Sequence, residues 1–138
     1  MRSVCWLVCL GVVVLFASRT PAEPTKVNFI MEWKGSVDDE ALQKLAPECI
    51  TTPKALEKLW TAWRVPAGLP KIDFTKEMVI VVTAGGSKLN VSARLDDKGN
   101  LDVLGMATLD AVPGFRYFIA TVSRDGVKTV NKKELPKE

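Results

Sequence analysis

The sequence contains no histidine in 138 residues. This absence removes the commonest general base, the Ser/His and Cys/His pairs of nucleophilic catalysis, and the usual mixed zinc sites. The acidic stretch "DDKGNLD" is not a calcium loop, because Lys98 and Gly99 stand where such a loop needs oxygen ligands. Two carboxylates that meet in space would suffice for acid–base catalysis, but no spacing selects a pair. The sequence therefore predicts no catalytic residues, no cofactor and no metal.

Cysteine is almost as scarce. Of the three cysteines, Cys5 and Cys9 lie in an apolar N-terminal stretch, which leaves only Cys49 in the rest of the chain. One thiol cannot form an intramolecular disulfide, so the fold is expected to depend on its hydrophobic core alone. Cys49 is expected to be a small buried hydrophobe between Glu48 and Ile50, with pairing to another chain as the alternative.

The N-terminal residues have the pattern of a secretion signal. Arg2 precedes an uncharged apolar stretch from Val4 to Ala17, and Thr20-Pro21-Ala22 supplies the small residues of a cleavage site. The stretch is shorter than the roughly 20 residues that span a bilayer. We expect residues 1–22 to be a signal peptide cleaved at Ala22/Glu23, with a retained anchor as the alternative. The mature protein is then exported, either periplasmic or secreted.

Charge of one sign does not accumulate in the remaining chain. The 19 basic residues fall to 17 when Arg2 and Arg19 leave with the signal, against 16 acidic residues. Only Lys132 and Lys133 are adjacent, so no patch that could follow a phosphate backbone is present. Nucleic acid is therefore not expected as a partner, and residues 23–138 are expected to form one domain.

The first half of this domain begins with a strand and a short helix. Residues 26–34 alternate between apolar and polar side chains except at Ile30, which is typical of a half-buried strand. Ser36 precedes Asp39 by three residues as in a capping box, and Pro47 closes the segment, so a short helix is expected between them. Its inward-facing residues would be Ala41, Leu42 and Leu45.

A second helix has clearer start signals. Thr52 stands at the N-cap position and Pro53 at the first helical position, where its missing N–H costs nothing. An apolar stripe follows at spacings of three and four, formed by Leu56, Leu59, Trp60 and Trp63. The two tryptophans are expected to pack in the core, because they lie on the stripe that the helix must bury.

The second half is rich in strands. Met78–Val82 is continuously apolar, which predicts a central strand covered on both faces. Residues 88–95 alternate and predict a strand with one wet face, followed by the turn "DDKGN" and a return strand in which Gly105 predicts a bulge. Phe115–Ser123 predicts a further strand, with Asp125-Gly126 as a hairpin turn and a loose polar tail. The predicted fold class is α+β, a single domain whose mostly antiparallel β-sheet packs with one or two helices.

The order of these elements resembles that of a known family. The tryptophan helix, Ile72-Asp73-Phe74, the apolar strand Met78–Val82 with its glycine turn, and the late "RYFIATV" strand are together similar to the C-terminal domain of PrcB-type protease-complex subunits. The similarity covers about Ile50–Ser123. It implies an exported, non-catalytic accessory module with a protein partner such as an exported protease. Ser87 follows the glycines where the family often has an aromatic residue, and Arg116 stands where it often has proline.

Two loops are expected to form the partner-binding surface. Gly85-Gly86 leads into an alternating strand rather than a helix, so it is no phosphate-binding loop, and we expect Thr83–Ser87 to lie beside Val112–Arg116. Both loops flank central strands, and aromatic and guanidinium groups favour interfaces. The candidate residues are Thr83, Gly85, Gly86, Ser87, Phe115 and Arg116.

The alternatives to this surface are a structural role and two other functions. Both loops could be plain connectors with Phe115 in the core. If they bind, Gly86→Ala or Arg116→Ala would weaken partner capture and leave the melting temperature nearly unchanged. The other functions are a peptidase inhibitor that presents a loop, and a carboxylate-based enzyme or small-ligand binder, which would show a pocket of acids with shifted pKa values.

Overall fold

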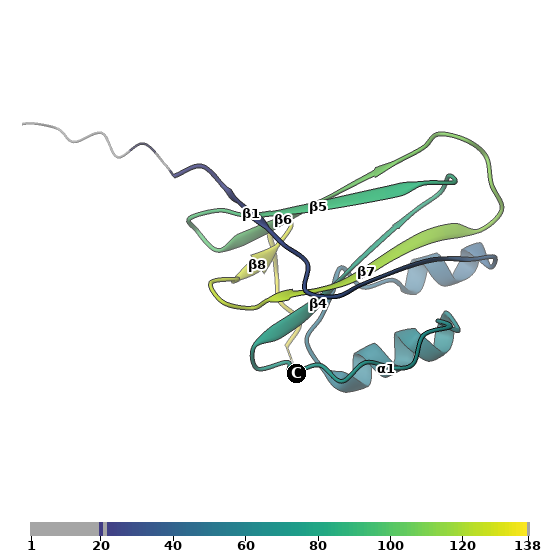
Figure 1. Cartoon of the computed structure of the whole chain (residues 1–138), viewed down its shortest axis with the longest axis horizontal. Coiled ribbons are helices and arrows are strands. Elements are labelled where there is room, and N and C mark those ends of the chain that lie inside the picture. Colours follow the sequence, from purple (N-terminus) through teal and green to yellow (C-terminus); the bar gives the residue numbers. More distant parts are fainter. Residues whose placement is uncertain (1–19, 21, 138) are drawn as a thin grey trace, which may run out of the picture.

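The computed structural model describes Thr20 and residues 22–137, and the predicted signal peptide lies almost entirely outside them. Figure 1 shows two layers of strands, with helix α1 (Pro53–Ala62) on the outer side of one of them. No helix in this part of the chain is long and apolar enough to cross a membrane. The predicted α+β class with mostly antiparallel pairing is confirmed.

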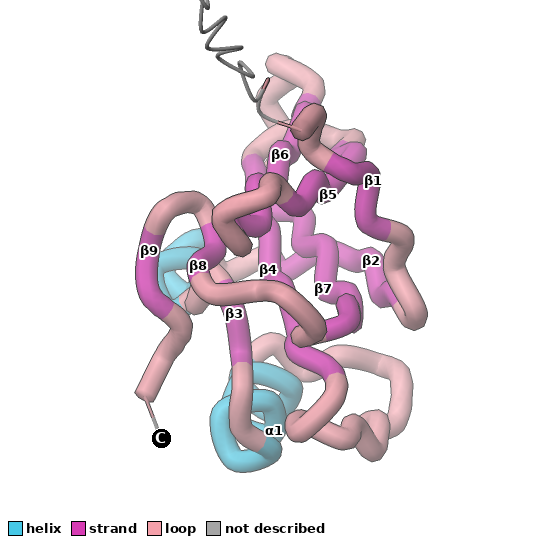
Figure 2. The backbone as a smooth tube through the Cα atoms, turned by 90° about the vertical axis from the view of Figure 1, so that its left-hand side faces the viewer, coloured by secondary structure: helices cyan, strands magenta, loops and turns pink. Residues whose placement is uncertain are grey.

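The strands form two sheets where one was expected. The four-stranded sheet is antiparallel throughout and has the order β2 (Glu32–Val37), β7 (Phe115–Ser123), β4 (Glu77–Ala84), β3 (Cys49–Ile50). The five-stranded sheet has the order β1 (Thr25–Val27), β5 (Leu89–Leu95), β6 (Asn100–Ala107), β8 (Thr129–Val130), β9 (Lys133–Glu134). Among the strands of the described residues, only β6 and β8 pair in parallel. Figure 2 shows β1, β5 and β6 in one layer, β2, β7 and β4 in the next, and α1 beyond them.

Strands β4 and β7 form the centre of the molecule, as their apolar runs predicted. They pair from Glu77↔Ser123 to Ala84↔Arg116. Because successive side chains of a strand point to opposite faces, each strand supplies two cores. Tyr117 and Ile119 point toward α1, whereas Phe118 points toward the five-stranded sheet.

The core under α1 contains the predicted tryptophans. Trp60 and Trp63 are 6% and 4% exposed, so their expected packing role is confirmed. Trp60 meets Trp33 edge to face at 5.2 Å between ring centroids, and Trp63 meets Phe115 at the same distance. The Thr52 cap is also confirmed, since its Oγ1 accepts a hydrogen bond from the Ala55 N–H at 3.3 Å.

The second core lies between the sheets. The strand predicted for residues 88–95 is confirmed as β5, and Ala93 on its apolar face is fully buried. Phe118 is 2% exposed and packs edge to face on Phe29 at 5.1 Å. The buried members of this core are Cys49, Met78, Ile80, Ala93, Leu101, Phe118, Ala120, Val122 and Val130.

The first predicted strand is in fact two strands in different sheets. β1 pairs with β5 and β2 pairs with β7, and the chain crosses between the sheets around Ile30, where the alternation fails. Thr121 holds the crossing: its carbonyl accepts from the Ile30 N–H at 2.9 Å and its hydroxyl from the Met31 N–H at 3.0 Å. A period-two pattern cannot distinguish one strand from two whose apolar residues enter different cores, as Phe29 and Trp33 do.

The short helix differs from its prediction. It is a 3₁₀ helix, η1 (Glu40–Leu45), capped by Asp39, whose Oδ1 accepts from the Ala41 N–H at 3.0 Å. The capping box that was expected from Ser36 is wrong, because Ser36 belongs to β2. Leu45 is 63% exposed rather than inward-facing, whereas Leu42 packs against the helix-side core.

The β5–β6 hairpin contains no bulge. Its register runs unbroken from Leu89↔Ala107 to Leu95↔Leu101, so the bulge expected at Gly105 is wrong. A Cβ at Gly105 would lie 2.8 Å from Val82 Cγ1. The glycine therefore serves close packing of the two sheets rather than a change of register.

The C-terminal segment is anchored rather than loose. The Val127 N–H donates to the Arg124 carbonyl at 3.0 Å, so a turn forms at Asp125-Gly126 as predicted, but β8 pairs with β6 and not with β7. The predicted hairpin is therefore wrong. Asn100 accounts for the different path, since its Oδ1 accepts from the Thr129 hydroxyl at 2.9 Å and from the Lys132 N–H at 2.8 Å.

Candidate functional site

The two predicted loops lie side by side at one end of the molecule, which we call the loop end. Ala84 at the end of β4 pairs with Arg116 at the start of β7, so the glycine turn and the segment before β7 are adjacent. Both lie at the right of Figure 1. The expected proximity is confirmed, although Thr83 belongs to β4 and its hydroxyl accepts from Gln43 Nε2 at 3.2 Å.

The glycine turn is braced against the segment that follows β6. The Ser87 N–H donates to Thr108 Oγ1 and to Asp110 Oδ1, each at 3.0 Å, and the Lys88 N–H donates to Thr108 Oγ1 at 3.1 Å. Hydrogen bonds from Ser87 and Thr108 hold the pKa of the Asp110 carboxyl well below its usual range. Asp110 therefore stays ionised near neutral pH and continues to accept the hydrogen bond from Ser87, because hydrogen bonding to a carboxylate favours its charged form.

Two of the predicted site residues are not available for contact. Phe115 is 1% exposed, and its ring packs on Trp63, so the expectation of an exposed aromatic is wrong. Gly86 is buried with φ +95°, and a Cβ there would overlap the carbonyl oxygen of Thr108. Gly85 and Ser87 are exposed as expected.

The loop end opens into a cleft of about 480 Å³ between β2, β7 and the start of β5. Its lining consists of Lys34, Gly35, Ser36, Ser87, Lys88, Leu89, Asn90, Arg116 and Tyr117. Three of these side chains are cations and none is a carboxylate, so we call it the cationic cleft. The sequence analysis proposed Ser87 and Arg116, and the structure adds Lys34 and Lys88 to them.

Strand geometry directs the cations into this cleft. Ser36 pairs with Arg116 and Lys34 with Phe118, so Lys34 and Arg116 lie on the face of the four-stranded sheet that looks toward β5. Lys34 Nζ lies 5.4 Å from the Phe118 ring centroid and 3.6 Å from Glu32 Oε1. The ion pair between Lys34 and Glu32 is largely exposed and contributes little to stability. Within the described part of the chain, the half-buried Arg116 guanidinium has no hydrogen bond or ion pair.

Sequence reasoning missed a second feature of the loop end, Leu109. Its side chain is fully exposed, at 103% of its reference area, between the two bracing residues Thr108 and Asp110. The only sequence signal is a leucine inside a loop-forming stretch. Leu109 therefore offers an apolar side chain to solvent at a position that the neighbouring hydrogen bonds fix.

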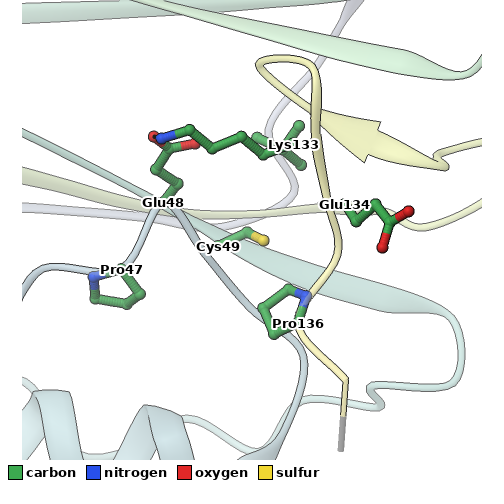
Figure 3. A pocket seen from close by; sticks show the side chains of 7 residues that line it. Pro47, Glu48, Cys49, Lys133, Glu134 and Pro136 are labelled. Carbon is green, nitrogen blue, oxygen red and sulfur yellow. Dashed lines mark hydrogen bonds and ion pairs between the residues drawn. The ribbon is translucent and has the colours of Figure 1, made fainter.

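A smaller pocket of about 210 Å³ contains Cys49 and lies under the C-terminal segment (Figure 3). Lys133 Nζ pairs with Glu48 Oε1 at 2.6 Å across its mouth. Burial, with a smaller contribution from Glu48, raises the pKa of the Cys49 thiol. The thiol is 6% exposed and free, which confirms the prediction of a buried cysteine. Across the described ranges, no three acids or cysteines group as metal ligands.

Cys49 is therefore expected to react slowly with thiol reagents in the folded protein. Its raised pKa and its cover both reduce the reactive thiolate. Truncation after Asn131 removes β9 and Pro136 from the pocket mouth, and we expect it to accelerate labelling by about tenfold or more. A thiol-reactive chromophore followed in native buffer measures both rates. Equal rates before and after truncation would show that the segment does not protect the thiol.

Comparison with family models, curated proteins and solved structures finds no match to this chain.

Proposed function

We propose that this chain is an exported, non-catalytic protein-binding module that supports or regulates an extracytoplasmic protease. The cationic cleft carries the proposal. Lys34, Lys88 and Arg116 come from three different strands or loops and converge on one opening, whereas residues 23–138 as a whole have 17 basic and 16 acidic side chains. The resemblance to PrcB-type subunits suggests the class of partner, and the gathered cations support the loop end as its proposed binding surface.

The chemistry of the cleft favours an acidic segment of the partner. The three cations repel one another, the exposed Glu32 beside Lys34 offsets little of this repulsion, and a ligand that brings negative charge relieves it. The Arg116 guanidinium can bind a carboxylate through two parallel hydrogen bonds. Leu109, on the same end of the molecule, adds a fully exposed apolar side chain beside this polar contact. Acidic residues next to an apolar pocket are thus the partner surface that fits.

A second candidate function, a peptidase inhibitor, is favoured by the braced Leu109 loop alone. A loop held by hydrogen bonds from Ser87 and Lys88 loses little conformational entropy when it enters an active-site cleft. The two functions differ in their effect on the partner. An accessory module leaves the captured protease active, whereas an inhibitor abolishes its activity, so a peptidase assay on the captured complex separates them.

Reversal of charge at Arg116 tests the proposal. We expect Arg116→Glu to reduce capture of the partner from the native envelope fraction by about tenfold or more, because loss or inversion of a desolvated charge contact costs several kcal/mol. Arg94→Glu is the matched control, since Arg94 is exposed on the outer face of β5, away from the cleft. Quantitative mass spectrometry of both eluates measures the ratio. Equal capture by the two variants, with melting temperatures unchanged, would remove the cleft from the binding surface.

A further inference from the structure

The outer edge of β6 is only partly paired. β8 pairs with Asn100 and Leu101 at the start of β6, and no strand of the described chain pairs with the rest of that edge. The Val103 N–H donates to Asn131 Oδ1 at 2.8 Å, which closes the paired part. Residues 104–107 are all exposed, with Leu104 at 60% and Met106 at 63%. Beyond the short strands β8 and β9, the five-stranded sheet thus has a short bare edge along β6, Val103–Ala107.

The backbone groups at this edge have known directions. In an antiparallel pair, alternate residues bond to the neighbouring strand and the residues between them point away. The Val103 N–H points away from β5, toward Asn131, so Gly105 and Ala107 point the same way. Gly105 and Ala107 therefore present N–H and C=O groups outward, and Val103 presents its carbonyl. Exposed groups of this kind template the addition of a further strand.

The usual protection of a free edge is missing here. Proteins protect bare edges with lysine, proline, inward-pointing charge or bulges. Residues 103–109 contain no charged residue and no proline, and the β5–β6 register has no bulge. Gly105 also has no side chain between its backbone and an approaching chain. The bare edge is therefore built to accept a strand rather than to repel one.

We infer that the strand it accepts is β6 of a second copy of this chain, antiparallel and related by a two-fold axis at Gly105. In this register Gly105 faces Gly105, and each copy's Ala107 N–H donates to the Val103 carbonyl of the other. Leu104 then lies opposite Met106 of the other copy, so the two exposed apolar residues of each chain cover one another. An edge that carried charge would repel its own copy, and this one carries none. The inference stands independently of the cationic cleft, which the pairing leaves open.

The register makes a sharp cross-linking test possible. Residues 23–138 are prepared as Leu104→Cys and as Met106→Cys, and the two variants are oxidised separately and as a mixture. Directly opposite residues are within disulfide reach, whereas Leu104 is diagonal to its own copy and out of reach. We expect a covalent dimer in the mixture and little in either variant alone. Equal yields in the three samples, or no product in the mixture, would overturn the inference.

Sedimentation equilibrium of the unmodified chain provides the second measurement. We expect a monomer–dimer equilibrium whose dissociation constant rises at least tenfold in Met106→Lys and in Ala107→Pro, which removes an edge N–H without disturbing β5. Thr25→Lys, on the opposite edge strand β1, is the control and leaves the constant unchanged. A chain that stays monomeric at every concentration tested, or a dimer that both edge variants leave intact, would contradict the inference. Slower amide exchange of Val103–Ala107 only in the presence of the protease partner would also contradict the inference, and would assign the edge to that partner.

Discussion

Gly86→Ala is expected to lower the free energy of unfolding by about 2–4 kcal/mol, because it combines a positive φ with a steric overlap. Gly86 has φ +95°, and an added Cβ would overlap the Thr108 carbonyl oxygen. The turn must shift, and the hydrogen bonds from Ser87 to Thr108 and Asp110 shift with it. Chemical denaturation at neutral pH measures the loss. The geometry at Gly86 thus argues against the expectation that Gly86→Ala leaves the melting temperature nearly unchanged.

Gly85→Ala is the matched control for this prediction. Gly85 is exposed, has no positive φ, and has nothing within 4 Å of an added Cβ. Its substitution is expected to change stability by less than about 0.5 kcal/mol, as is usual for surface sites. Comparison of the two variants thus separates the effect of backbone strain at Gly86 from the effect of adding a methyl group to the loop. A similar loss in both variants would contradict the description of Gly86 as the strained position.

Trp63→Ala is expected to have the largest effect of any single change under α1, about 3–5 kcal/mol. Trp63 is 4% exposed and contacts the rings of Phe115 and Tyr117 at 5.2 and 5.5 Å. Its Nε1 also donates to the Leu42 carbonyl at 3.3 Å, which ties η1 to the helix. Loss of the indole therefore leaves a cavity and releases η1. The free energy of unfolding from urea titration measures the total.

Trp63→Phe distinguishes the two contributions. Phenylalanine keeps most of the ring contacts but cannot donate to Leu42, so we expect a loss of about 1–3 kcal/mol. In the same variant, amide exchange in η1 should accelerate more than exchange in β4 or β7. An equal loss in the alanine and phenylalanine variants would show that the hydrogen bond, not the packing, dominates at this site.

The strands that fill both cores were predictable because their side chains carry the signal. Met78–Val82 is apolar over its whole length and Phe115–Ser123 is apolar except at Arg116, Thr121 and Ser123, and burial on both faces favours that pattern. The helix start at Thr52 was predictable because its cap and the following proline act locally. Structural features that depend only on residues adjacent in the sequence, such as this cap, can be predicted from a single sequence.

Pairing between distant segments was not predictable from those patterns. The crossing between the sheets near Ile30 depends on Thr121, which accepts two hydrogen bonds there. Thr121 is distant in sequence, so the residues around Ile30 do not indicate it. The path from β7 to β8 depends in the same way on Asn100, which holds Thr129 and Lys132. Polar side chains that satisfy remote backbone groups decide such connections, and their partners exist only in the folded chain.

The candidate site shows the same division. Ser87 and Arg116 were predicted because their loops contain glycines and flank central strands, and because Arg116 carries a guanidinium group. Lys34 and Lys88 join them only through the register of β2 with β7 and the turn into β5, so their charges could not be assigned to one place beforehand. Phe115 was misassigned because an aromatic at a strand start fits a loop surface and a core equally well.

Hydrogen exchange of the chain with and without its captured partner tests the central claim, binding at the loop end, most directly. We expect slower exchange in residues 85–88 and 108–114 of the complex, with α1 unchanged, because Ser87 and Lys88 line the cationic cleft and Leu109 belongs to the second segment. Slower exchange confined to α1, or no change at either loop despite a stable complex, would contradict the account.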